Sequence, residues 1–307
     1  MSTGVVAHIS LLSAAGLGRS DLGSLISTWR TDAGGLVLTS IGAVAVAAYG
    51  VMLLVSRRHA PTRSFDVQGA AFLGGVLVCL WAFCSGLSSM NDRAPGVVVA
   101  DHLALVTLAP VLLALGSPMR RSRAAFARWA PSRPKMARAA VLAFHPAVGF
   151  AILVSLEYLF LLSPLYGWSL AHQSGGDLVR GAFLIAGCFY WWPIVGTDLW
   201  PRKLGGGGRM IDIAAMLPFT AFLGIDLTLT DRRLARSGSL EATHIAGAEL
   251  WGYPTLFTIG ALGAVLFWWM RQEDERAEEL DRGLDTIDAA EAIVQEAEFR
   301  MRNGDDD

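Results

Sequence analysis

Seven long apolar stretches follow one another along the chain, separated by shorter polar or charged segments. They cover roughly residues 35–55, 67–88, 96–116, 141–163, 178–197, 210–229 and 250–270. Each is close to the about 20 residues that a helix needs to cross the hydrocarbon core of a bilayer. None alternates apolar and polar positions as a half-buried strand would. The pattern predicts an all-α, polytopic membrane helix bundle with seven transmembrane helices.

Composition supports a membrane domain joined to one soluble segment. Hydrophobic residues make up 53% of the chain and charged residues only 17%, whereas soluble domains are about 25% charged. Residues 271–307 carry five Arg against fourteen Asp and Glu, although the whole chain has a net charge of −2. We therefore expect an external N-terminal segment at 1–33, a transmembrane domain at 34–271 and an acidic, cytoplasmic helical tail at 272–307.

The basic residues of the connecting segments predict how the helices are oriented. The segments 56–66, 117–140 and 198–209 together hold thirteen Lys and Arg, and those on the other side hold six. Since the more basic side faces the cytoplasm, the N-terminus should lie outside and the C-terminus inside. The basic 117–140 segment is then placed against anionic lipid headgroups.

Several ionisable residues fall inside the predicted helices, where they are costly and often functional. The predicted orientation brings most of them to the outer side of the membrane: Asp101, His102, Glu157, Arg180 and Asp226 within helices, with His172 and His244 in or beside outer segments. One interpretation is a structural ion pair between Arg180 and Glu157 or Asp226. The other is an outer metal site, since a carboxylate beside an imidazole can orient a metal-binding ring.

Two motifs and their surroundings resemble the CtaG-type, caa3-type cytochrome c oxidase assembly factors. The segment from Asp101-His102 leads into LAPVLLALGSP at residues 108–118, and YWWPIVG occupies residues 190–196. The resemblance covers roughly residues 25–272. One of the four histidines in the family's two motifs carries over, as His102. The other three family histidines would fall on residues that are not histidine: Val98, Gly176 and Arg180.

The resemblance implies a role in assembling or maturing a haem–copper cytochrome c oxidase, in the cytoplasmic membrane of a bacterium. Its partners would be oxidase subunits or a copper chaperone, together with membrane lipid, and no nucleic acid is expected. Copper is the implied cofactor. Its candidate ligands are His102, Asp101, His172 and His244, because imidazole suits copper. A scaffold that holds an oxidase subunit or a copper chaperone without binding copper is the second version of this function.

Two other classes of function are weighed against this one. A transporter or permease for a metal ion or small solute would need polar groups that cross the bilayer, but only Asp212 and His145 lie toward the inner side. A membrane enzyme could use Asp101, His102 and Glu157 for acid–base chemistry. The chain holds no HExxH, GxSxG or phosphate-loop sequence, so we expect a protein that is not an enzyme.

Overall fold

The computed structural model describes residues 29–59, 67–85, 95–120, 144–196, 198, 204–233 and 239–303. The chain divides into two compact units, Met1–Thr258 and Ile259–Asp307. The division falls inside the last predicted apolar stretch. The two units are called unit 1 and unit 2 and are described separately.

All the named elements in the described ranges are helices. In chain order they are α3 (Ala33–His59), α4 (Val67–Cys84), α6 (Pro95–Leu103), the π-helix η1 (Ala104–Leu108), α7 (Ala109–Leu115), α10 (Pro146–Leu162), α11 (Leu165–Ala171), α12 (Gln173–Val195), α13 (Gly206–Leu229) and α14 (Leu240–Asn303). Six described helices are long and apolar enough to cross a membrane, and the bent pair of α10 and α11 would make a seventh. The all-α membrane bundle is confirmed, whereas its orientation stays a prediction.

The predicted fourth span is the one that departs most from a simple helix. His145 caps the start of α10, because its Nδ1 accepts a hydrogen bond from the Ala147 N–H at 3.1 Å. The helix ends at Leu162, the backbone of the following Ser163 is extended, and the chain bends by 73° into α11. Pro164 follows the break, and a residue before proline is disfavoured in the helical conformation. The turn therefore has a local cause in the Ser163-Pro164 pair.

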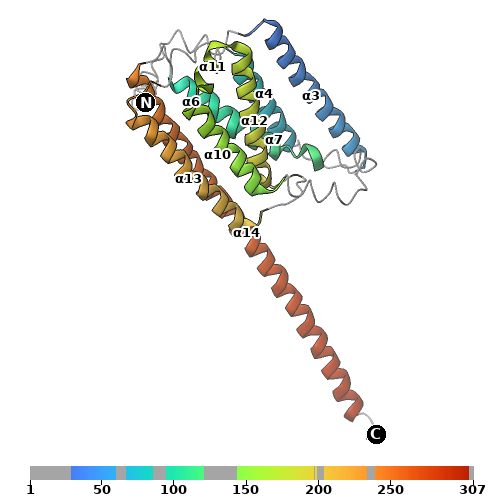
Figure 1. The fold of residues 1–307 in the computed structure, drawn as a ribbon. Helices are drawn as coiled ribbons and strands as arrows, with labels where there is room; N and C mark the ends of the chain where they lie inside the picture. The colour runs from blue at the N-terminus through green and yellow to red at the C-terminus, as the bar shows by residue number, and fades with distance from the viewer. Residues whose placement is uncertain are drawn as a thin grey trace, which may run out of the picture. The chain divides into compact units, whose positions relative to one another are not determined.

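Helix α12 lies at the centre of unit 1 and packs against α7, η1, α10 and α11, and Figure 1 shows these helices side by side. It approaches η1 closely. Pro110 has no N–H, so it cannot bond the carbonyl of Val106 four residues earlier. A Cβ atom at Gly187 of α12 would lie only 2.4 Å from that carbonyl oxygen. Glycine thus allows α12 to pack directly on the irregular backbone around Pro110.

Gly187→Ala is expected to lower the free energy of unfolding by about 1–3 kcal/mol, because the new methyl group must displace backbone atoms. Gly181→Ala is the matched control on the same helix, since nothing lies within 4 Å of a Cβ atom there. That control should be neutral or slightly stabilising. Thermal unfolding of both variants in one detergent tests the close approach, and equal midpoints would contradict it.

Asp198, just past the end of α12, ties α12 to the segment that follows α7. Its carboxylate accepts backbone N–H bonds from Met119 at 3.0 Å and Arg120 at 2.5 Å. The indole N–H of Trp192 donates to the same carboxylate at 3.3 Å. Asp198 is fully buried, with 1% of its surface exposed. The two motif segments identified in the sequence, 108–118 and 190–196, are thus joined at their ends.

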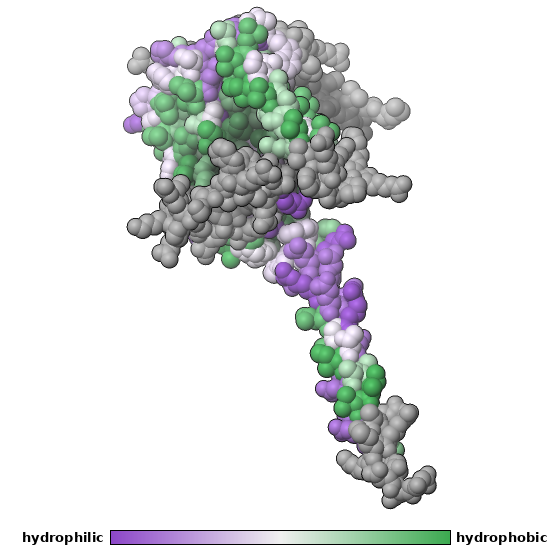
Figure 2. Space-filling model, turned by 90° about the vertical axis from the view of Figure 1, so that its right-hand side faces the viewer, coloured by the Kyte–Doolittle hydropathy of each residue, from purple (hydrophilic) through white to green (hydrophobic). Residues whose placement is uncertain are grey.

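The surfaces of the two units differ in character. On unit 1, many large apolar side chains are exposed on the helix faces, and Figure 2 shows them as green patches. This is expected of helices that face lipid. In unit 2, α14 continues through the acidic segment as one helix to Asn303, and its described side chains there are mostly exposed. Figure 2 shows hydrophilic residues followed by a stretch with more apolar ones along it.

Candidate functional site

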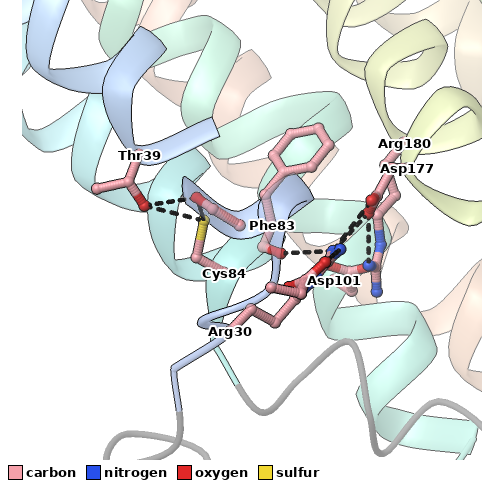
Figure 3. A network of polar contacts seen from close by, with 9 residues as sticks. Arg30, Thr39, Phe83, Cys84, Asp101, Asp177 and Arg180 are labelled. Atoms are coloured by element: carbon pink, nitrogen blue, oxygen red, sulfur yellow. Dashed lines mark hydrogen bonds and ion pairs between the residues drawn. The ribbon is translucent and has the colours of Figure 1, made fainter. Parts of the chain in front are cut away.

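Arg30, just before α3, organises a network of polar contacts near one end of α4. Its backbone N–H donates to the Cys84 carbonyl at 2.7 Å, and its Nη1 donates to the Phe83 carbonyl at 3.4 Å. Cys84 also contacts α3, since its thiol donates to the Gly35 carbonyl at 3.8 Å. Figure 3 shows Arg30 extending from this contact toward Asp177. The segment before α3 is therefore fixed against α4.

The Arg30 guanidinium binds two carboxylates, those of Asp177 and Asp32. Nη1 bonds both oxygens of Asp177, at 2.8 and 3.0 Å, and Nε and Nη2 bond those of Asp32 at 3.0 and 2.9 Å. The hydrogen bonds from Arg30 lower the pKa of Asp32 to about 2. The bonds to Asp32 and then to Asp177 raise the pKa of Arg30. Both groups are therefore ionised at neutral pH.

A second arginine continues the network into the bundle. Arg180 Nε donates to Asp101 Oδ2 at 2.7 Å, and Arg180 Nη1 lies 4.0 Å from Asp177 Oδ1. The sequence interpretation that Arg180 pairs with Glu157 or Asp226 is therefore wrong. Asp101 on α6 and Arg180 on α12 face each other across the contact of these helices, and a buried charge takes the nearest opposite charge. We call Arg30, Asp32, Asp101, Asp177 and Arg180 the polar junction.

His102 and Glu157 form a separate pair beside the polar junction. His102 Nε2 lies 3.5 Å from Glu157 Oε1, and Glu157 is only 4% exposed. The edge of Phe183 packs against the imidazole, with ring centroids 4.8 Å apart. These contacts join α6, α10 and α12. The structure thus brings His102 and Glu157 together, as well as Asp101 and Arg180.

The other predicted site residues lie elsewhere. A His172 ring nitrogen is 3.1 Å from the Trp168 carbonyl, and His244 Nε2 is 2.9 Å from the Thr230 carbonyl. Asp226 is exposed on α13. Among the described residues, no group of three or more His, Cys, Asp or Glu could hold a metal ion. The four candidate copper ligands therefore do not converge in this structure.

Three members of the polar junction, Arg30, Asp32 and Asp177, were not selected from the sequence. Arg30 was counted among the six basic residues outside, and Arg30 and Asp32 were noted only as part of the segment that precedes the first span. Asp177 was noted only as a polar residue beside an outer segment. Their roles depend on which helix ends meet in space. The available signal was that Arg30, Asp101 and Asp177 all lie close to the start of a predicted span that begins on the same side.

A family model matches most of the chain, including the helices that carry the site. The model of the family described as cytochrome c oxidase caa3 assembly factor (Caa3_CtaG) matches residues 47–272. The chain belongs to this family. The matched region holds α4 to α13, and with them the His102–Glu157 pair and the Asp198 contacts.

The curated relatives are mycobacterial proteins described as uncharacterised. A Mycobacterium bovis protein and one from Mycobacterium tuberculosis are each 26% identical across 91% of this chain and 45% of their own length. A Mycobacterium leprae protein is 29% identical across 76% of this chain and 39% of its own length. The chain thus spans less than half the length of these relatives. No solved structure matches it.

Proposed function

We propose that this protein assists assembly of cytochrome c oxidase as a scaffold in the bacterial cytoplasmic membrane, holding an oxidase subunit or a copper chaperone. The family supports the assembly role. The observation that favours a scaffold is the pairing of Asp101 with Arg180 at 2.7 Å, because it commits a candidate metal ligand to a permanent cation. The Caa3_CtaG chain would then act by contact and not by chemistry.

The described residues do not fit a resident copper ion. Copper sites gather several imidazole or sulfur ligands around one point. Here Asp101 bonds Arg180, while His172 and His244 each contact a backbone carbonyl. A guanidinium beside Asp101 also repels any second cation placed on that carboxylate. Copper handed to the oxidase as cargo remains a separate prediction.

The polar junction supports the scaffold in a second way. It joins the segment before α3 with α6 and α12, through Arg30, Asp177 and Arg180. Groups held by several charge-assisted hydrogen bonds keep a fixed geometry. If the predicted orientation is correct, this end of the bundle faces the side on which the oxidase's own copper centre would be matured. A rigid end of this kind suits the docking of another membrane subunit.

The deciding experiment compares a strain lacking this gene with the same strain complemented by the wild type or by His102→Ala. The scaffold predicts that the deletion loses assembled oxidase and its activity, that added copper does not restore them, and that His102→Ala protein carries no less copper than wild type. Mild crosslinking should recover an oxidase subunit or copper chaperone. Copper that purifies with the protein in proportion to His102, together with rescue by copper, would contradict the scaffold and favour metal delivery.

A further inference from the structure

We propose that unit 1 contains a hydrated interior site, in which one or two water molecules bind between the Trp191 indole and the His102–Glu157 pair. The site lies in a cavity of about 40 Å³ that is lined by residues of five spans, among them Thr107, Glu157, Trp191, Met216 and Thr258. A cavity needs about 10–15 Å³ to hold a water molecule. The proposal concerns this chain alone and does not depend on the assembly role.

The first argument is a hydrogen-bond donor that the protein does not satisfy. Trp191 is 7% exposed, and its Nε1 has no hydrogen-bond partner among the residues that the structure describes. The neighbouring Trp192 shows the usual situation, since its indole N–H donates to Asp198. Buried polar groups are nearly always paired with protein or with ordered water. Trp191 lines the cavity, so a ligand bound there is placed to accept a hydrogen bond from its indole N–H.

The second argument is the length of the neighbouring polar contact. His102 Nε2 and Glu157 Oε1 are 3.5 Å apart, beyond the usual range of about 2.7–3.2 Å for an N–H···O bond. A contact of this length is weak, so the Glu157 carboxylate keeps hydrogen-bonding capacity for water bound beside the pair. Glu157 is 4% exposed and also lines the cavity. A buried carboxylate needs more hydrogen bonds than one loose imidazole provides.

The chemistry of these two groups selects the ligand. It must accept a hydrogen bond from the Trp191 N–H and donate one to the Glu157 carboxylate, and water does both. A metal cation cannot accept the indole proton. The backbone offers further partners, because Pro254 has no N–H for the Leu250 carbonyl four residues earlier and both residues line the cavity. Water here would solvate the His102–Glu157 pair inside an otherwise largely apolar bundle.

The main test is NMR of the full chain in lipid nanodiscs, with ¹⁵N-labelled tryptophan. The Trp191 indole signal is assigned by its loss in Trp191→Phe, and the Trp192 signal in the same way. We expect magnetisation transfer from water to the Trp191 indole proton and none, or far less, to the Trp192 indole proton, which is buried but bonded to Asp198. Equal absence of transfer at both indoles would mean a dry cavity and would overturn the proposal.

A second measurement replaces the Trp191 indole by an isosteric benzothiophene ring, which removes only the N–H donor. A hydrated site predicts a lower thermal midpoint, because a water-mediated bond is lost. A dry cavity predicts a higher midpoint, because an unsatisfied donor is removed. The same replacement at Trp251, which is 42% exposed, is the control and should leave the midpoint unchanged. A midpoint raised by sodium, potassium or copper salts in wild type but not in Glu157→Gln would instead identify a cation site and reject water.

Discussion

Arg180→Met is expected to lower the free energy of unfolding of unit 1 by about 3–5 kcal/mol, since it leaves a buried carboxylate without its cation. Asp101 and Arg180 side chains are only 8% and 11% exposed. Among the described residues, Arg180 is the one ion-pair partner of Asp101, whose Oδ1 has no hydrogen bond. The Arg180 guanidinium is therefore the main group that compensates for burying the Asp101 carboxylate.

Removing Asp101 should reduce the free energy of unfolding less than removing Arg180 does. Asp101→Ala leaves Arg180 with Asp177, whose Oδ1 lies 4.0 Å away, so we expect the free energy of unfolding to fall by about 1–2 kcal/mol. The double variant should be more stable than Arg180→Met alone, because it contains no unpaired charge. Such a recovery distinguishes a paired charge from a side chain that matters only for packing.

Thermal unfolding in one detergent measures this cycle, with Arg276→Met as the matched control. Arg276 also bonds a carboxylate, Glu273 at 2.8 Å, but its side chain is 66% exposed. Exposed ion pairs contribute about 0–1 kcal/mol to stability, so the thermal midpoint of Arg276→Met should stay close to that of the wild type. If Arg180→Met and Arg276→Met have equal effects, or if the double variant is the least stable of all, the buried pair is not the main contribution at this site.

The spans were predictable because each depends on local hydrophobicity alone. A long apolar run in lipid must form a helix to satisfy its own backbone hydrogen bonds, regardless of its neighbours. The helices α3, α4, α12 and α13 accordingly coincide with their predicted stretches. The predicted fourth stretch ends at residue 163, where α10 also ends, but neither the 73° bend at Ser163-Pro164 nor the short helix α11 beyond it was predicted. Local turn chemistry overrides a pattern averaged over 20 residues.

The pairing of charges was less predictable, because it depends on how helices rotate and which faces meet. The sequence selected Asp101, Glu157 and Arg180 as intramembrane polar residues, but the structure pairs Arg180 with Asp101, and Glu157 lies beside His102. Topology gives the depth of a residue along the membrane normal, but it gives no angle about the helix axis. Two acids at similar depth are therefore equal candidates until the packing of α12 is known.

Asp198→Ala is expected to lower the free energy of unfolding by about 2–4 kcal/mol, because at least three donors among the described residues lose one buried acceptor. The carboxylate bonds the N–H groups of Met119 and Arg120, at the start of a helical turn, and the Trp192 indole. Negative charge is favoured at a helix start, so charge and hydrogen bonds act together. Nothing in the sequence pattern singled out this residue.

Asp198→Asn separates the two contributions, since an amide oxygen can still accept hydrogen bonds but carries no charge. We expect its thermal midpoint between those of wild type and Asp198→Ala, with Asp226→Ala, an exposed acid on α13, near wild type. The Trp192 indole signal should shift in both Asp198 variants. An Asp198→Ala midpoint equal to the Asp226→Ala control would show that the ends of α7 and α12 are held by apolar packing, as at Gly187, and that the carboxylate adds little.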